Sequence, residues 1–366
     1  MEKILINGNF LNRNLTGIER FSWETCKRLD GILTAQDDFS ILVSANPKVI
    51  PEFKNIKVIR SKKIIKNFPF WDLIEFPKYC KKTGSVGLNF SNTAPLGKNC
   101  GYAFLHDIYA KVFPKDFSSV KDKLVRVYSL LNYKNIAKNA KIVFTVSEFS
   151  KNQIAEIYKI STEKIRVIPN GWDHFATIEE DERIFGKFPS LKKGDFYFTL
   201  GSLSKRKNLA WICGYAKNHP GENFAVSGKA ISGLVPEELK DLQTLKNVTL
   251  LGYVSDGEVK SLMKNCKAFV FPSYYEGFGI PPLEALSVGA KIIVSKAASL
   301  PEIYKDAARY ILPDNTNIQL EKLLKEETAA PDEILKKYTY DAAAQKLLET
   351  LRLFLKVSVN KTRTKP

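Results

Sequence analysis

The sequence of 366 residues has few cysteines and histidines, and none of them are spaced as metal ligands. Its five cysteines form no C-x-x-C pair, which argues against both a disulfide framework and a structural zinc site. The three histidines are too few and too dispersed for a metal cluster. No Asp-x-Asp pair occurs either, so the simplest means of holding a divalent ion beside a diphosphate is missing. We therefore expect a site that uses no metal ion and no other cofactor.

Long apolar runs are also missing. No segment approaches the roughly 18 consecutive apolar residues of a membrane-spanning helix, and the run near the N-terminus is too short for a secretory signal. We therefore expect a cytoplasmic protein. No helix-turn-helix, zinc or RNA-binding signature occurs, so nucleic acid is not an expected partner.

Positive charge is in excess and is unevenly distributed. The net charge is +17, and residues 1–168 hold 28 Lys and Arg against 15 Asp and Glu, whereas the remainder holds 28 against 24. A basic half attracts polyanions such as nucleic acid or an anionic membrane that carries lipid-linked substrates. The same excess can also serve solubility alone. Peripheral contact with an anionic membrane is one expectation that follows.

One segment could provide such a membrane contact. In residues 60–82, bulky aromatic side chains stand between basic clusters, a composition that suits docking at a lipid headgroup layer. Because aromatic residues are usually buried, they could equally fill the core of the first domain. These aromatic residues are Phe68, Phe70, Trp71 and Phe76.

Short apolar runs alternate with helical patterns along the whole chain. The runs lack polar alternation, as is typical of strands buried on both faces of a parallel sheet. A chain of this length exceeds one core, so the repeated strand–helix units predict an α/β fold with two doubly wound domains. The predicted strands are residues 3–7, 40–44, 86–90, 102–107, 142–147, 196–201, 223–228, 248–253, 268–273 and 291–295.

The boundary between the domains is expected near residue 170. A strand ends there at Pro169, and the Asn170-Gly171 pair is typical of a turn. Further along, Ser255 followed by Glu258 forms a capping box, which predicts the start of a helix. The stretch 340–357 has the apolar spacing of an amphipathic helix.

The most specific motif lies in residues 271–295. Glu276 stands in a loop after a strand, and Glu284 follows two prolines that suit the first turn of a helix. Gly277 and Gly279 allow a ligand to approach the backbone, and the helix start offers N–H groups to anionic oxygens. One carboxylate can bind sugar hydroxyls while the other binds a ribose diol. A Gly-Pro surface loop with a helix-capping glutamate would contain the same residues.

A second motif, residues 200–209, places Lys205, Arg206 and Lys207 after the strand that ends in Gly201. Ligands of α/β proteins bind at this carboxyl edge of the sheet. Cations there can neutralise the charge that grows on a departing diphosphate, a contribution on the order of 3 kcal/mol for each important donor. The alternative is a solvated basic turn.

Both motifs, with residues 250–259 and 299–315, resemble glycosyltransferase family 4, the retaining transferases of the GT-B fold. The family's Gly-Ser-Leu-x-x-Arg-Lys-Asn phosphate loop matches residues 201–208 nearly in full, and its Glu-Gly-Phe-Gly-x-Pro-x-x-Glu signature matches residues 276–284. The resemblance is strongest to mannosyl- and rhamnosyltransferases of bacterial surface polysaccharides. It implies two Rossmann-like domains facing across a cleft: an acceptor-binding domain (1–170), a nucleotide-sugar donor domain (171–340), and a helix and tail (341–366) that return to the first domain.

The resemblance also implies a role for each motif residue. Lys207 and Arg206 hold the diphosphate, Glu276 the transferred sugar and Glu284 the ribose. Other residues expected in the donor site are Gly201, Ser202 and Lys205 of the phosphate loop, the backbone of Phe278, Gly279 and Ile280, and Tyr253 and Val254 beside the base.

Two expected site residues lie in the first half. Gly17, in TGIERF, corresponds to the family's glycine loop facing the donor phosphates, although many members have two glycines there. His106, in FLHD, corresponds to a histidine that faces the transferred sugar and is expected to be catalytic with Lys207, Arg206 and Glu276. A lone histidine at a strand end is, by itself, more often structural.

The resemblance therefore implies a retaining, metal-independent hexosyltransferase. It would move a hexose or deoxyhexose from a GDP-, UDP- or dTDP-linked sugar to a hydroxyl of a glycan or lipid-linked acceptor. The product would belong to O-antigen, capsule or exopolysaccharide. A non-catalytic scaffold in polysaccharide assembly and a nucleic-acid-binding protein are the alternatives.

Overall fold

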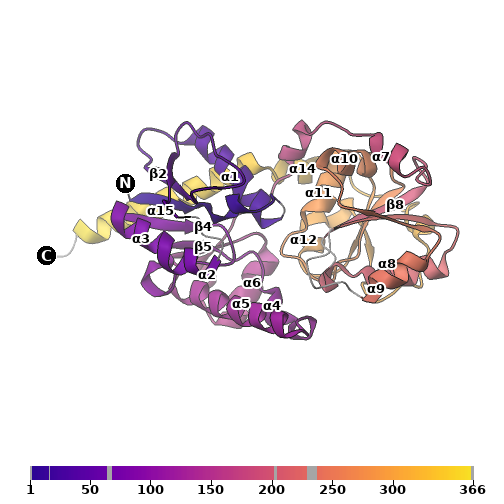
Figure 1. Ribbon diagram of the computed structural model, residues 1–366, viewed down its shortest axis with the longest axis horizontal. Coiled ribbons are helices and arrows are strands. Elements are labelled where there is room, and N and C mark those ends of the chain that lie inside the picture. The colour runs from indigo at the N-terminus through magenta and orange to yellow at the C-terminus, as the bar shows by residue number, and fades with distance from the viewer. Residues whose placement is uncertain (1, 16, 64–67, 202–203, 229–236, 364–366) are drawn as a thin grey trace. The chain divides into compact units, whose positions relative to one another are not determined.

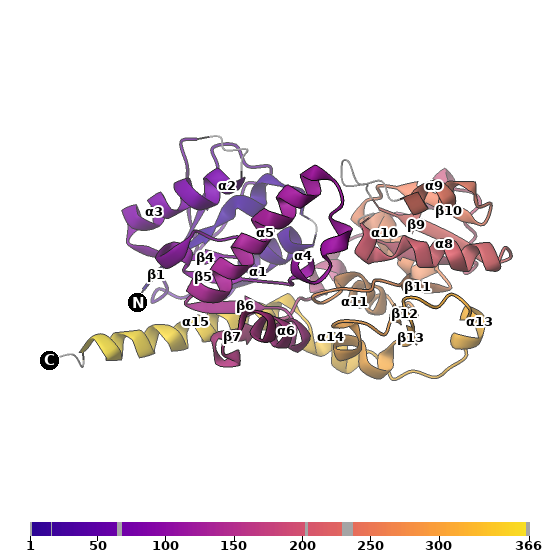
Figure 2. The ribbon, with the colours of Figure 1, turned by 90° about the horizontal axis from the view of Figure 1, so that it is seen from below.

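The chain folds into two compact units. The computed structural model describes residues 2–15, 17–63, 68–201, 204–228 and 237–363. One unit comprises residues 1–171 with 339–366, and the other comprises residues 172–338 (Figures 1 and 2). The chain therefore leaves the first unit once and returns to it for its last segment.

The first unit contains a seven-stranded sheet in which every strand pair is parallel. Its strand order is β3-β2-β1-β4-β5-β6-β7, the pattern of a doubly wound domain. The strands are β1 (Lys3–Asn7), β2 (Phe39–Val43), β3 (Lys57–Arg60), β4 (Ser85–Asn89), β5 (Tyr102–Phe104), β6 (Ile142–Thr145) and β7 (Ile165–Val167).

The second unit contains a six-stranded parallel sheet in the order β10-β9-β8-β11-β12-β13. Each of the ten predicted segments overlaps an observed strand, and β7 is the strand expected to end near Pro169, whereas β3 and β13 were not predicted. Strand β3, at a sheet edge, has an exposed charged residue at each end and only two apolar residues between them, so it lacks the longer apolar run of a buried strand. The strands are β8 (Phe196–Leu200), β9 (Asn223–Ser227), β10 (Val248–Gly252), β11 (Ala268–Phe271), β12 (Ile292–Ser295) and β13 (Arg309–Ile311).

Strand β1 shows why helices pack on both faces of the first sheet. Ile4 and Ile6 belong to one core with helices α1 and α15, whereas Leu5, which points to the opposite face, packs with Trp71 and Phe76. The helices of this unit are α1 (Ile18–Ile32), α2 (Phe68–Phe70), α3 (Phe76–Thr83), α4 (Tyr109–Val112), α5 (Val120–Asn139), α6 (Glu148–Tyr158) and α15 (Tyr340–Arg363).

The C-terminal helix α15 completes the core of the first unit. Ala343, Ala344, Leu347 and Leu351 are buried in the same cluster as Phe21 of α1. These four residues form the apolar side of the amphipathic helix that the sequence predicted. The small side chains of Ala343 and Ala344 allow α15 to pack closely against α1.

Helices also flank the second sheet. The predicted capping box is present: Ser255 caps α10, and the Glu258 side chain accepts a hydrogen bond from the Ser255 backbone N–H at 2.8 Å. The helices are α7 (Arg183–Lys187), α8 (Leu209–Asn218), α9 (Glu237–Thr244), α10 (Asp256–Asn265), α11 (Ile280–Ser287), α12 (Leu300–Tyr304), α13 (Leu320–Leu323) and α14 (Asp332–Lys337).

The aromatic segment 60–82 mostly fills a core. Trp71 and Phe76 are fully buried, and Nε1 of Trp71 donates a hydrogen bond to Oδ1 of Asn7 at 2.7 Å. Membrane docking through Trp71 was therefore a wrong interpretation, because its ring is fully buried against the sheet of the first unit. Phe70 is partly exposed, and the side chain of Phe68 lies outside the described residues. Within the described residues, no helix combines the length and apolar character needed to cross a bilayer.

Candidate active site

The basic motif forms a tight turn at the carboxyl end of β8. Lys205–Lys207 make one turn of 3-10 helix, and Asn208 follows with a left-handed φ of 57° before α8 begins. The side-chain amide of Asn208 donates to the carbonyl of Pro272 at 3.1 Å and to that of Pro313 at 2.7 Å. These two bonds hold the turn against the loops that follow β11 and β13.

The turn brings two cations onto one carboxylate. Nζ of Lys207 lies 2.7 Å from Oε1 of Glu276, and NH1 of Arg206 lies 2.9 Å from Oε2. Glu276 is 5% exposed. Burial on its own would raise the pKa of Glu276, but the charges of Arg206 and Lys207 outweigh burial and hold the pKa below its ordinary value. The site therefore keeps three charges near neutral pH, with a net charge of +1.

Backbone contacts fix the loop that carries Glu276. The Ser299 hydroxyl donates to the carbonyls of Glu276 at 3.0 Å and Phe278 at 3.3 Å, and the Tyr304 hydroxyl donates to that of Gly279. Gly279 has a φ of 90°, and a Cβ there would lie 2.6 Å from Cδ2 of Leu300. Only glycine fits this position without strain.

The second carboxylate of the motif pairs with a histidine. Glu284 lies on α11, and its Oε1 is 3.1 Å from Nε2 of His174, whose side chain is 4% exposed. Sequence reasoning missed His174 as a site residue. It is remote from Glu284 along the chain, so no motif spacing could indicate the pair.

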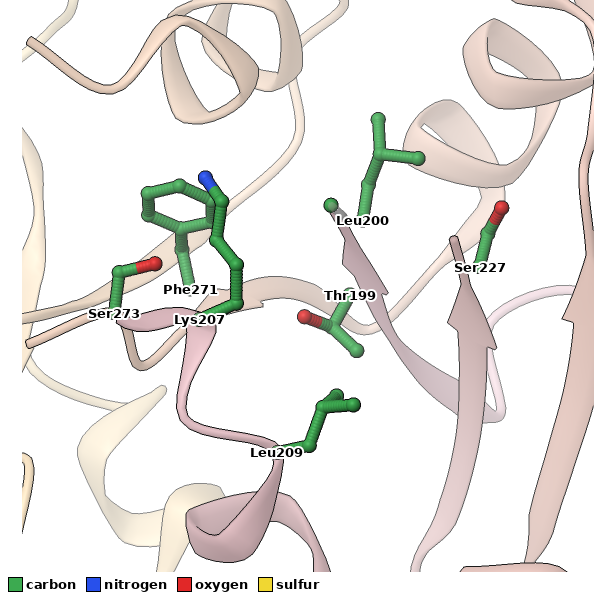
Figure 3. Close-up of a pocket in the computed structure, with 8 residues that line it drawn as sticks. Thr199, Leu200, Lys207, Leu209, Ser227, Phe271 and Ser273 are labelled. Atoms are coloured by element: carbon green, nitrogen blue, oxygen red, sulfur yellow. The ribbon is translucent and has the colours of Figure 1, made fainter. Parts of the chain in front are cut away.

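A small pocket opens beside Lys207, at the carboxyl ends of β8, β9 and β11. Figure 3 shows the Lys207 side chain rising next to the ring of Phe271, and its Nζ lies 4.5 Å from the ring centroid. The stem of Lys207 passes Gly201 so closely that a Cβ there would lie 3.2 Å from Cδ and Cε. The lining residues are Thr199, Leu200, Gly201, Lys207, Leu209, Ser227, Phe271 and Ser273.

The other predicted donor-site residues have different environments. Phe278 is buried and packs edge-on against Tyr338, with ring centroids 5.2 Å apart. Val254 is buried, whereas the preceding Tyr253 is 73% exposed. Lys205 is exposed, Ile280 is partly exposed at the start of α11, and Ser202 lies outside the described residues.

The two predicted residues of the first unit follow β1 and β5. Gly17 has a φ of 53° and is the N-cap residue that immediately precedes α1. His106 is buried between Phe21 and Phe104, and its Nε2 lies 2.7 Å from the carbonyl oxygen of Phe90. Because the carbonyl can only accept, Nε2 carries a proton. Burial lowers the pKa of His106, so the ring is neutral near pH 7.

A buried polar network at the ends of β1 and β4 was not predicted. The Asn7 amide donates to Asp72 at 2.9 Å and to Asn89 at 3.1 Å, and the Thr93 hydroxyl donates to the other Asp72 oxygen at 2.7 Å. Burial raises the pKa of Asp72. The network ties the helical segment after residue 67 to the sheet. Among the described residues, no three His, Cys, Asp or Glu side chains gather as a metal-binding group.

Comparison with known proteins places the chain in a family. A sequence model described as glycosyl transferases group 1 matches residues 180–344. The O-antigen chain mannosyltransferase RfbU of Salmonella typhimurium is 31% identical over 257 residues, which cover 69% of this chain and 67% of that protein. The chain belongs to the group 1 glycosyltransferases.

Other proteins similar to this chain are named for, or were solved with, different sugars. A UDP-Gal:alpha-D-GlcNAc-diphosphoundecaprenol alpha-1,3-galactosyltransferase of Escherichia coli is 28% identical to this glycosyltransferase over 295 residues, which cover 76% of this chain and 72% of that protein. The structure of Anabaena HepE in complex with UDP-glucose superimposes with a TM-score of 0.67 at 18% identity, and covers 96% of this chain and all of that one. The predicted GT-B fold, with two Rossmann-like domains, is confirmed.

Proposed function

We propose that this glycosyltransferase is a retaining family 4 hexosyltransferase in the synthesis of O-antigen or a related surface polysaccharide. It moves mannose, or another hexose or deoxyhexose, from a nucleoside-diphosphate sugar to a hydroxyl of a glycan or lipid-linked acceptor. The observation that carries the proposal is the convergence of Lys207 and Arg206 on Glu276 beside the pocket at the sheet edge. The named relatives transfer mannose and galactose, which leaves the sugar to be decided by experiment.

The two cations suit a diphosphate leaving group. In the proposed reaction, the bond between the anomeric carbon and the phosphate oxygen breaks, and its electron pair goes to the diphosphate. Lys207 and Arg206 stabilise this charge from positions that are already fixed before the donor binds. The acceptor oxygen bonds to the same face of the anomeric carbon, and its proton passes to the departing phosphate.

In our proposal, Glu276 has one role in the donor-free protein and another in the donor-bound protein. Without a donor, its carboxylate balances the two cations, which would otherwise be poorly solvated charges. When the diphosphate binds these cations, the carboxylate oxygens become available to accept hydrogen bonds from hydroxyls of the transferred sugar. Glu284, held by His174, binds the ribose diol.

The same arrangement explains why we propose catalysis without a metal ion. Two fixed cations supply the positive charge that a divalent ion would otherwise bring to a diphosphate. The basic first half is in keeping with an acceptor held at the cytoplasmic face of an anionic membrane. Activity should therefore persist in EDTA, and loss of turnover that added Mg²⁺ restores would contradict this part.

A thermal-shift panel of GDP-mannose, UDP-galactose, UDP-glucose and dTDP-rhamnose tests the proposal. A ligand at 100 times its Kd stabilises the folded state by about 2.7 kcal/mol, so the true donor should raise the Tm by several degrees. The shift should disappear in Lys207→Ala. Incubation of that donor with an acceptor should give a product whose anomeric configuration, measured by NMR, matches that of the donor. The absence of any shift, or an inverted product, would overturn the proposal.

A further inference from the structure

Helix α5 has an apolar face that points outward. Val120, Leu124, Val127 and Leu131 are between 53% and 77% exposed. Their spacing of i, i+4, i+7 and i+11 places all four on one side of the helix. Large apolar residues scattered singly on a surface are ordinary, but a continuous row along three helical turns marks an interaction surface.

The inner side of α5 packs into a hydrophobic core through Tyr133 and Ile136, and it also carries two asparagines that are held by specific contacts. Asn132 accepts a hydrogen bond from the N–H of Ala94 at 3.3 Å, and the Asn135 amide donates to the carbonyl of Pro95 at 3.0 Å. The orientation of the helix is therefore fixed by these contacts. The loop that they hold presents another exposed apolar residue, Leu96, which is 55% exposed. We call Val120, Leu124, Val127 and Leu131 together with Leu96 the α5 face.

The exposed charges on α5 itself are all positive. Lys121, Lys123, Lys134 and Lys138 are all exposed on the same helix. Its single acidic residue, Asp122, is buried in the capping box with Ser119. An apolar row bordered by lysines is the pattern of helices that lie in a lipid headgroup layer, because lysine stems extend along the apolar surface while their amines reach anionic groups.

We infer that the α5 face docks on an anionic lipid bilayer, with its apolar side chains in the boundary between headgroups and acyl chains. The lysines bind lipid phosphates, which makes the contact dependent on lipid charge and on salt. This surface differs from segment 60–82, whose Trp71 is buried. The benefit to catalysis, namely contact with a lipid-linked acceptor, rests on the proposed function, but the docking itself does not.

Vesicle co-sedimentation of the full chain tests the inference. The wild type should bind vesicles rich in phosphatidylglycerol, bind phosphatidylcholine vesicles much more weakly, and lose affinity as salt rises. Leu124→Ser/Leu131→Ser should weaken binding to the anionic vesicles at least tenfold. Leu353→Ser is the matched control, since Leu353 is 64% exposed on α15. Lys121→Gln/Lys123→Gln should reduce both the affinity and its salt dependence.

Three results would overturn the inference. The first is unchanged vesicle binding by the double leucine variant, and the second is equal binding to neutral and anionic vesicles. The third is a dimer, seen by analytical ultracentrifugation, that dissociates when the leucines are substituted while vesicle binding is unaffected. The α5 face would then join two copies of the chain. Circular dichroism and the donor-induced thermal shift should stay unchanged in these variants. Vesicle binding therefore tests the docking, whereas the thermal shift tests the proposed function.

Discussion

Nζ of Lys207 lies 2.7 Å from Oε1 of Glu276, so the lysine of the 200–209 motif and the first carboxylate of the 271–295 motif meet before any donor is bound. The carboxylate holds Lys207 beside the pocket, at the ring of Phe271. Lys207 thus needs little reorganisation when a diphosphate arrives, which is the condition under which a fixed charge contributes most to catalysis.

Lys207→Ala should lower kcat by about 100- to 1000-fold, as expected when one fixed donor to a developing negative charge is removed. The fold should survive, because Arg206 still pairs with Glu276. Steady-state kinetics with the donor that the thermal-shift panel selects would measure the effect. Lys217→Ala is the control, since Lys217 forms a surface ion pair with Asp241. A turnover of Lys207→Ala within threefold of wild type would remove the proposed role.

Glu276→Gln should separate diphosphate binding from transfer. Without the competing carboxylate, Lys207 and Arg206 are more available to a nucleoside diphosphate, so its affinity should rise. The transfer rate should fall by at least tenfold, because an amide cannot accept hydrogen bonds from sugar hydroxyls at both of its ends. Isothermal titration with UDP or GDP and a transfer assay would give the two values. Weaker diphosphate binding in the variant would contradict the exchange of partners.

The same variant should change how stability depends on pH. The pKa of Glu276 in the folded protein is lower than in the unfolded chain, so the ionised carboxylate stabilises the fold above the ordinary glutamate pKa. This contribution is lost as the pH falls below the ordinary glutamate pKa and through the lower pKa of the folded protein. Wild type should exceed Glu276→Gln in unfolding free energy by about 2 kcal/mol at pH 7, with partial exposure of Arg206 limiting the difference. Urea unfolding should show the two proteins converging toward pH 3.

His174→Ala should raise the KM for the donor about tenfold with little change in kcat. His174 touches Glu284 and acts through it, so its loss should loosen the carboxylate that binds the ribose. His174→Gln, which can still donate a hydrogen bond, should recover part of the affinity. His219→Gln serves as control, because the His219 ring stacks on Tyr215, with Nδ1 3.0 Å from the Tyr215 carbonyl oxygen, and has no part in the proposed donor site. A fall in kcat with unchanged KM would place His174 elsewhere in the mechanism.

Gly279→Ala should destabilise the protein by about 2–3 kcal/mol and remove donor binding. Alanine is strained at a φ of 90°, and its Cβ would overlap Leu300, so the loop that carries Glu276 must shift. Gly186→Ala on α7 should be neutral or slightly stabilising, since a Cβ there meets nothing within 4 Å. Thermal unfolding of the two variants measures the contrast. Equal Tm values would show that the loop adapts without cost.

The interior strands were predictable because each is a continuous apolar run, and the predicted segment 3–7 coincides with β1. Strand β13 was missed because it contains only three residues, one of them an arginine that donates to the carbonyls of Leu323 and Glu326. Trp71 shows a case in which the composition of a segment predicted the wrong environment for a side chain. In the sequence it stands between two basic clusters, but its contacts come from Asn7 and the underside of the sheet, which composition does not reveal.

The sequence by itself determined the strand–helix alternation, the glycine and proline positions of the donor loop, and the cations and carboxylates of the two motifs. These properties are local, because they depend on periodicity and on the backbone freedom of single residues. Only the tertiary structure decided that Glu276 neutralises Lys207 and Arg206, that His174 holds Glu284, and that the apolar side of α5 points outward. Each of these depends on which distant segments the parallel sheets bring to the same edge or leave uncovered, and pairing between remote residues leaves no periodic signal in the chain.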